Sequence, residues 1–251
     1  MRVGLFVTCL VDVYRPNVGF SAVELIERAG YEVAVPTGQT CCGQPAYNNG
    51  DREDARRIAR QVIDLFEEFP YVVVPSGSCA GMLRLHYPRL FEHDPQWRER
   101  AETFAGRVHE LTAFLVDVAG VNGVEANHVG NCTYHDSCSA QRELGVRAQP
   151  RTLLASVRGL ELREMEDTEV CCGFGGTFCV KYPEISERMV SDKVAAVEAS
   201  GVDMLLAGDL GCLLNIAGRL KREGSAVRSY HVAEVLAGRS DVPGIGDGED
   251  A

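Results

Sequence analysis

The sequence predicts an α/β fold made of two pseudo-symmetric units, each with a small parallel sheet and flanking helices. Three observations predict this fold. Four cysteines recur in each half of the 251-residue chain, in the same order and at nearly the same spacing. Short apolar, β-rich runs alternate with helical patterns, which is typical of a parallel sheet. The recurring cysteines follow the ends of these runs, and ligands collect at the carboxyl ends of parallel strands.

The cysteine spacing indicates a duplication. In the first half, Cys9 precedes the pair Cys41–Cys42 by 32 positions, and Cys79 follows it by 37. In the second half, Cys138 precedes the pair Cys171–Cys172 by 33 positions, and Cys212 follows it by 40. A glycine follows each pair, and chance predicts only about 0.04 Cys-Cys-Gly triplets at this composition.

The repeat length sets the expected domain limits. We expect an N-terminal domain at 1–125 and a C-terminal domain at 126–240. Residues 121–131 are rich in Gly and Asn and mark the boundary. The acidic, Gly-rich segment 241–251 is expected to be a disordered tail.

The first half alternates strand and helix patterns. The apolar run 2–8 is typical of a strand and ends at Cys9. Apolar residues then recur at helical spacing up to Gly30, and 31–36 predicts a second strand that leads to the Cys-Cys-Gly loop. Residues 51–69 predict an amphipathic helix capped by Asp51, and 71–75 predict a buried strand before Cys79.

The second half repeats this plan. Strands are expected at 132–136, 160–165 and 202–208, each leading to one of the recurring cysteine positions, and a long helix is expected at 183–200. Between the halves, residues 93–120 have the pattern of two helices.

Composition excludes several functional classes. The net charge of −11 argues against a surface for nucleic acid or anionic membrane. No run of eighteen apolar residues is present in the sequence, and its start is more typical of a strand than of a signal peptide. We therefore expect a cytoplasmic protein, in which ten cysteines are not a disulfide framework.

The chemistry of the cysteines leaves three alternatives: an iron–sulfur cluster, a zinc ion, or thiol redox exchange. Structural zinc usually takes short C-x2–4-C segments, which this sequence lacks. Ligands that come from far apart, with one adjacent pair, suit a larger object and favour iron–sulfur ligation. Gly43 and Gly173 would permit the sharp turn that an adjacent pair requires. The sequence contains neither a G-x-G-x-x-G nor a Walker A motif, and it assigns no catalytic residue.

Four other residues are weaker candidates. Cys132 and Cys179 have no counterpart in the other half and are expected to be small buried hydrophobic residues, although Cys179 is close enough in sequence to Cys172 to replace a ligand. His135 and Asp136 directly precede Cys138, either as hydrogen-bonding neighbours of a cluster or as capping or core residues.

The paired segments, each with a later cysteine, resemble the cysteine-rich CCG-domain family, which includes a subunit of heterodisulfide reductase and the iron–sulfur subunit of glycolate oxidase. The motifs TCLVDVYRPNVG, GQTCCGQPAYNNG, CCGFGG and GDLGCLLNIAGRL resemble its lactate-utilisation branch over roughly residues 2–237. The resemblance implies the electron-transfer subunit of a multi-protein complex that oxidises L-lactate to pyruvate. The implied partners are a ferredoxin-like, iron–sulfur lactate utilisation protein B and a smaller lactate utilisation protein C. An equivalent subunit for glycolate or another 2-hydroxy acid, or a zinc-stabilised scaffold, remains an alternative.

The resemblance also implies a ligand set. One cluster, expected to be [4Fe-4S], would be bound by Cys9, Cys41, Cys42 and Cys79, and another by Cys138, Cys171, Cys172 and Cys212. In heterodisulfide reductase the last cysteine of each half begins a C-x-x-C, but here Met82 and Asn215 occupy the fourth positions. Four thiolates for each cluster, rather than five, are therefore expected.

Overall fold

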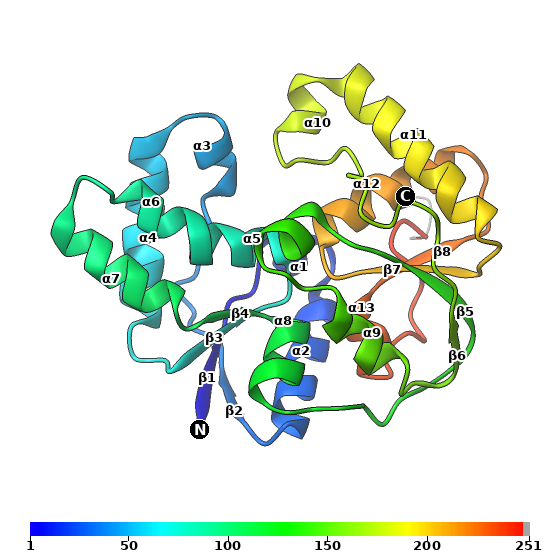
Figure 1. The fold of residues 1–251 in the computed structure, drawn as a ribbon, viewed down its shortest axis with the longest axis horizontal. Coiled ribbons are helices and arrows are strands. Elements are labelled where there is room, and N and C mark those ends of the chain that lie inside the picture. The colour runs from blue at the N-terminus through cyan, green and yellow to red at the C-terminus, as the bar shows by residue number, and fades with distance from the viewer. Residues whose placement is uncertain (248–251) are drawn as a thin grey trace.

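The structure, a computed structural model, describes residues 1–247, which form two α/β units of the same topology (Figure 1). Each unit has a four-stranded parallel sheet, with strand orders β2-β1-β3-β4 and β6-β5-β7-β8. The strands are β1 (Arg2–Leu5), β2 (Glu32–Ala34), β3 (Tyr71–Val74), β4 (Val108–Glu110), β5 (Asn127–His135), β6 (Arg158–Leu162), β7 (Met204–Ala207) and β8 (Arg228–His231). The predicted α/β fold with two similar units is confirmed.

Helices connect the strands of the N-terminal unit and cover its sheet. They are α1 (Cys9–Tyr14), α2 (Pro16–Arg28), α3 (Gln44–Asn48), α4 (Arg52–Phe66), α5 (Gly77–Gly81), the π-helical η1 (Met82–His86), α6 (Tyr87–Leu90), α7 (Pro95–Ala105), α8 (Leu111–Ala113) and the π-helical η2 (Phe114–Val118). Asp51 caps α4 as predicted, since its carboxylate accepts a hydrogen bond from the Asp54 amide at 3.0 Å.

The C-terminal unit has fewer connecting helices within the described residues. They are the π-helical η3 (Ser139–Glu143), α9 (Ala148–Leu154), α10 (Phe178–Lys181), α11 (Pro183–Ala199), α12 (Leu210–Arg222) and α13 (Val232–Leu236). Helix α11 is the long helix that the sequence predicts at 183–200.

The sequence interpretation missed the edge strands β4 and β8. The segment 93–120 is not two successive helices, because β4 lies between α7 and α8 and pairs with β3 through Val72 and Val108. An edge strand of three residues is too short to show an alternating pattern against the helices around it. Strand β5 is longer than expected and begins at Asn127, within the segment interpreted as the boundary.

The two units share one core. Buried residues of β1 and α2, among them Val3, Leu5 and Ile26, belong to the same apolar cluster as Leu205 and Ile216 of the C-terminal unit. A second cluster lies within the N-terminal unit, between the opposite face of its sheet and helices α4, α6 and α7. The two repeats are therefore packed into one body.

The contacts between the units follow the repeat. Helix α2 packs against α13, and α8 packs against α9 (Figure 1). These pairs are equivalent, because α2 and α9 follow the first strand of their units whereas α8 and α13 follow the last. Arg15 Nε lies 2.8 Å from Glu234 Oε1, which is fully buried and also accepts a hydrogen bond from Asn17 at 2.7 Å.

The chain after residue 240 differs from expectation as far as the structure describes it. Up to residue 247 it lies against the C-terminal unit: Ile245 is buried, its amide donates to Ser229 O at 2.8 Å, and Tyr230 donates to Val242 O at 3.0 Å. The remainder of the expected tail, 248–251, lies outside the described residues. Within residues 1–247 there is no helix of sufficient length and apolarity to cross a bilayer.

Two candidate metal centres

The eight recurring cysteines gather in two sets, as the repeat predicts. The N-terminal set consists of Cys9, Cys41, Cys42 and Cys79, and the C-terminal set of Cys138, Cys171, Cys172 and Cys212. In each unit the three segments that carry them follow the carboxyl ends of the first, second and third strands along the chain. Thiol side chains from distant parts of the sequence therefore meet at one edge of each sheet.

The N-terminal thiols interact in series. Cys41 contacts both Cys9 and Cys42, and Cys42 contacts Cys79. Hydrogen bonding from Cys42 and then Cys9 lowers the pKa of the Cys41 thiol, whereas the contact with Cys41 raises the pKa of Cys9 and of Cys42. One thiolate is thus stabilised by neighbouring S–H donors. A bound metal would displace these thiol protons and take over the stabilisation of the thiolates.

The C-terminal thiols show the same pattern. Contacts with Cys138 and then Cys172 lower the pKa of the Cys171 thiol, and the contact with Cys171 raises the pKa of Cys138 and of Cys172. In both sets it is therefore the first cysteine of the adjacent pair whose thiol pKa is lowered. A structural feature common to both loops contributes to this: the amides of Gly43 and Gly173 point at Cys41 Sγ and Cys171 Sγ, at 3.5 and 3.4 Å.

The glycine after each pair produces the turn that the sequence predicts. Gly43 and Gly173 have φ of +84° and +82°, in the left-handed region that favours glycine. The carbonyl of the second cysteine is satisfied differently in the two loops. Tyr87 Oη donates to Cys42 O at 2.9 Å, whereas Asn215 Nδ2 donates to Cys172 O at 2.8 Å. Asn215, which stands in place of a possible fifth ligand, thus orients the loop.

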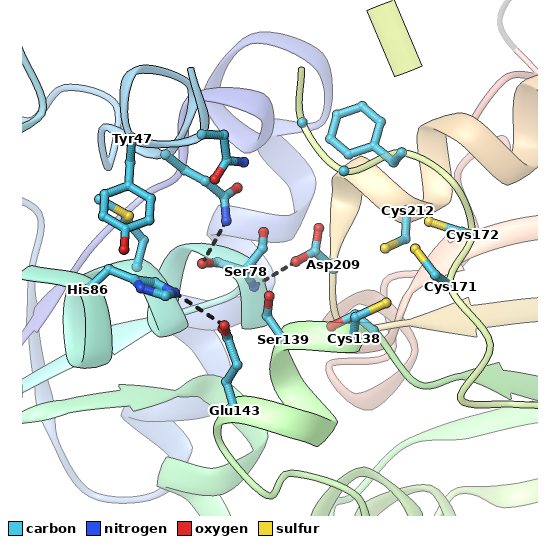
Figure 2. Close-up of a pocket in the computed structure, with 17 residues that line it drawn as sticks. Tyr47, Ser78, His86, Cys138, Ser139, Glu143, Cys171, Cys172, Asp209 and Cys212 are labelled. Carbon is cyan, nitrogen blue, oxygen red and sulfur yellow. Dashed lines mark hydrogen bonds and ion pairs between the residues drawn. The ribbon is translucent and has the colours of Figure 1, made fainter. Parts of the chain in front are cut away.

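Each thiol set lies at the wall of a cavity that the other unit helps to form. The cavity at the C-terminal set has a volume of about 310 Å³, and Met82 of the N-terminal unit lines it. Tyr47 and His86 of the same unit also line it (Figure 2). The cavity at the N-terminal set has a volume of about 170 Å³ and is lined by Phe174 and Gly211 from the C-terminal unit. Both sites therefore depend on the contact between the units.

Asp209 and Ser78 line both cavities and lie between the two sets. Asp209 Oδ2 accepts hydrogen bonds from the Ser78 amide at 2.8 Å and from Ser76 Oγ at 3.1 Å (Figure 2 shows the first). Helix α5, which carries Cys79, also packs against η3, directly after Cys138. Gly77 permits this approach, because a Cβ there would lie 2.5 Å from the Ala140 Cβ.

The residues outside the two sets have other roles. Cys132 is fully buried in β5, and burial raises the pKa of its thiol to about 12, which agrees with its interpretation as a packing residue. Cys179 is only half-buried, and its thiol donates to Gly176 O at 3.4 Å. Asp136 is buried and forms a bidentate pair with Arg151, both distances being 2.9 Å.

His135 lies directly beside the C-terminal set. It is fully buried, and a ring nitrogen and the sulfurs of Cys172 and Cys212 all lie within 4.8 Å of one another. Neither ring nitrogen makes a hydrogen bond of normal geometry within residues 1–247, although the Thr168 backbone interacts with the imidazole. Burial lowers the pKa of this imidazole to about 4. Of the two roles considered for His135, the structure favours a neighbour of the thiol set.

The sequence interpretation missed Lys193, which is only 2 % exposed. It lies on the buried face of α11 with Val190, Val194 and Val197, and its ammonium donates to Asp167 O. Lys193 falls at the helical spacing at which the apolar residues of α11 recur. This spacing could have revealed it, because a lysine on the apolar face of a helix must be buried.

The donor sets fit a metal that prefers sulfur. Each set offers four thiols from three segments, and soft thiolate ligands select zinc or iron–sulfur clusters over hard cations. The neutral His135 imidazole has one N–H group, and the two glycine amides add two more, all of which can face cluster sulfurs. All ten cysteines, which lie within the described residues, are free thiols.

Comparisons with known proteins agree with this architecture. Residues 3–84 and 132–217 match the family described as "Cysteine-rich domain", CCG, so that each match covers one thiol set. The chain is 48% identical to "Lactate utilization protein A 2" of Bacillus cereus (strain AH820) over 237 residues, which are 94% of this chain and 98% of that protein. It is 50% identical to "Lactate utilization protein A" of Bacillus cytotoxicus over 240 residues, which are 96% of this chain and 100% of that protein.

A solved structure shares the fold. A hypothetical protein from Helicobacter pylori superposes with a TM-score of 0.69 at 10% identity, over 96% of this chain and 49% of that protein. The chain thus spans about half of that longer protein, and at this identity the likeness supports the fold alone.

Proposed function

Because the chain belongs to the cysteine-rich CCG-domain family and has near full-length relatives named lactate utilization protein A, we propose that it is the iron–sulfur electron-transfer subunit of a complex that oxidises L-lactate to pyruvate. The observation that carries the proposal is the pairing of two equivalent four-thiol sets around one interface. Zinc is redox-inert, so a structural zinc role would not explain why the two sets lie at cavities that have lining residues in common.

The eight recurring cysteines would ligate one cluster in each unit, with [4Fe-4S] as the proposed type. Such clusters exchange single electrons, so that two of them together would accept the two electrons released when L-lactate becomes pyruvate. This chain's residues would bind and separate the centres: the low-pKa thiols Cys41 and Cys171 would be ligated first, and the amides of Gly43 and Gly173 would face sulfur.

The proposed partners are a ferredoxin-like iron–sulfur protein B and a smaller protein C of the same system, in the cytoplasm. The free thiols suit a reducing compartment. With a net charge of −11, the chain would associate best with a partner that presents a basic face. A role with glycolate or another 2-hydroxy acid would use the same centres and differ only in the partner that binds substrate.

The test is the metal content of protein purified without oxygen. We expect about eight irons with matching sulfide per chain and an EPR signal that dithionite changes. Reconstitution with proteins B and C should then reduce an electron acceptor with L-lactate and fail with any one component omitted. Stoichiometric zinc with neither iron nor an EPR signal would replace this proposal by the zinc-stabilised scaffold.

A further inference from the structure

The buried side chains that pack beneath the two thiol sets differ, and we call them the floor of each set. Because the two units are repeats, equivalent positions of the two floors can be compared. Phe6 and His135 occupy equivalent positions, each three residues before the first cysteine of its set. The buried faces of α4 and α11 also correspond at a constant offset in numbering. Val62 is thereby equivalent to Lys193, and Phe66 to Val197.

The floor beneath the N-terminal set is apolar. Phe6 is fully buried, packs on Phe66 with ring centroids 5.8 Å apart, and belongs to the same apolar cluster as Val62, Cys42 and Cys79. These side chains offer the sulfurs no N–H group and no positive charge.

The floor beneath the C-terminal set is polar. His135 places a ring nitrogen next to Cys172 and Cys212, and neither of its ring nitrogens makes a hydrogen bond of normal geometry among residues 1–247. Lys193 interacts electrostatically with Cys172 and Cys138, and its hydrogen bond to Asp167 O fixes its ammonium beneath the loop that leads to Cys171. Burial lowers the pKa of Lys193, and thiolates at Cys172 and Cys138 act in the opposite direction and favour its charged form.

The other charged and hydrogen-bonding groups around the thiols include some that both sets share. The glycine amides face sulfur in both, at 3.5 and 3.4 Å. Asp209 lines both cavities, and Ser76, Ser78 and Gly211 all donate hydrogen bonds to its carboxylate, but its charge also acts on Cys212 in the direction opposite to Lys193. Arg142 adds a positive charge near Cys138. The His135–Lys193 floor therefore supplies a buried ring nitrogen and a buried cation that the N-terminal floor lacks.

We propose that His135 and Lys193 raise the reduction potential of the C-terminal cluster above that of the N-terminal cluster, so that electrons entering the protein collect at the C-terminal centre. This inference rests on the proposed iron–sulfur function. Reduction adds negative charge to a cluster, and N–H donors or a cation beside the sulfurs stabilise that charge. An apolar floor gives no such stabilisation.

The experiment is an EPR-monitored redox titration of the full chain with both clusters loaded. The wild type should show two reduction waves, and Cys41→Ser and Cys171→Ser variants should assign them to the N-terminal and C-terminal centres. His135→Phe, which copies Phe6, should lower the C-terminal wave alone. We expect the equilibrium constant for electron transfer between the centres to fall at least tenfold, which is about 59 mV for a one-electron couple. Lys193→Met should act in the same direction.

Two further variants keep the test independent of folding defects. His135→Gln retains an N–H donor and should restore part of the separation lost in His135→Phe. Phe6→His should raise the N-terminal wave. Equal potentials in the wild type, a higher N-terminal potential, or a separation unchanged in both His135→Phe and Lys193→Met would overturn the inference while leaving the two clusters in place. Absence of iron would instead overturn the proposed function itself and remove this inference with it.

Discussion

Ser76 Oγ donates a hydrogen bond to Asp209 Oδ2 at 3.1 Å, and these two residues are equivalent in the repeat. Each lies three residues before the last cysteine of its unit and caps the helix that carries that cysteine, α5 or α12. Both are buried. The caps that position Cys79 and Cys212 therefore meet at the interface, which couples the geometry of the two thiol sets.

Replacing Asp209 by Ala should destabilise the protein more than the loss of one small side chain would suggest. The change leaves the Ser76 hydroxyl and the Ser78 amide without their acceptor inside the protein, and hydrogen bonds to a charged group contribute about 1.5–3 kcal/mol each. We expect the free energy of unfolding, measured by urea denaturation, to fall by at least about 2 kcal/mol. Asp192→Ala is the control, because its exposed i,i+4 pair with Arg188 contributes little. Equal losses in the two variants would contradict the buried linkage.

The two thiol sets should lose metal independently. Cys41→Ser removes a thiol of lowered pKa from one set and Cys171→Ser removes its equivalent from the other, so each should lower the iron content from about eight to about four per chain. Iron and sulfide analysis of anaerobically purified protein measures this. Cys179→Ser should leave the iron content unchanged, because Cys179 belongs to neither set. Loss of all iron from one cysteine change would indicate a single shared centre.

The glycines after the cysteine pairs should respond unequally to substitution by Ala. Both have positive φ, which costs an L residue about 1–2 kcal/mol. A Cβ at Gly173 would also lie 2.8 Å from the backbone oxygen of Ser186, whereas at Gly43 it would meet only the Ile58 side chain, at 3.3 Å. The free energy of unfolding should therefore fall further in Gly173→Ala.

A glycine in α12 provides the control for that pair. Gly218 has no positive φ, and the nearest atom to its added Cβ is the end of the Arg222 side chain at 3.7 Å. Gly218→Ala should stabilise the chain by roughly 0.5–1 kcal/mol, since Gly is unfavourable in a helix. Urea unfolding of all three variants tests the order, and Gly43→Ala proving the more damaging would contradict it.

Sequence reasoning reached the two thiol sets because covalent spacing carries that information. The order of cysteines in each half, the glycine after each pair and the strand-like runs before them all predict where the thiols meet. Tyr87 and Asn215, which fix the cysteine carbonyls, could not be predicted in the same way. Their roles depend on how η1, α6 and α12 lie over the loops, which is a property of packing.

The interface was the least predictable part of the molecule. Two sheets of the same topology could be separate domains, and only the three-dimensional packing of α2 on α13 and α8 on α9 joins their cores. Glu110 lies near Gly208 and Asp209 of the C-terminal unit, and His231 interacts with the backbone of Pro75 in the N-terminal unit. The edge strands β4 and β8, which end at these residues, are short and lack alternation, so the sequence gave no signal that they lie at this interface. Lys193 did give a signal, since it interrupts an apolar helix face.

Glu110 predicts how stability depends on pH. Burial raises the pKa of its carboxyl from 4.5 to about 7, although hydrogen bonds from Thr112 and Ala113 act in the opposite direction. Between these pH values the folded chain binds a proton that the unfolded chain does not, so the free energy of unfolding falls as pH rises through this window. The loss from pH 5.5 to 8 should be about 2 kcal/mol relative to Glu110→Gln, which retains the acceptor but does not titrate.

Comparison with Glu110→Gln at each pH is needed because His135 acts with the opposite sign. Burial lowers the pKa of His135 to about 4, so its contribution is lost as pH falls below 6.5, and this loss occurs equally in both proteins. Urea unfolding at several pH values should therefore show Glu110→Gln gaining stability relative to the wild type as pH rises. Glu53→Gln, at an exposed position, should run parallel to the wild type. A parallel profile for Glu110→Gln would show that Glu110 is ionised throughout and that the interface accommodates its charge next to Asp209.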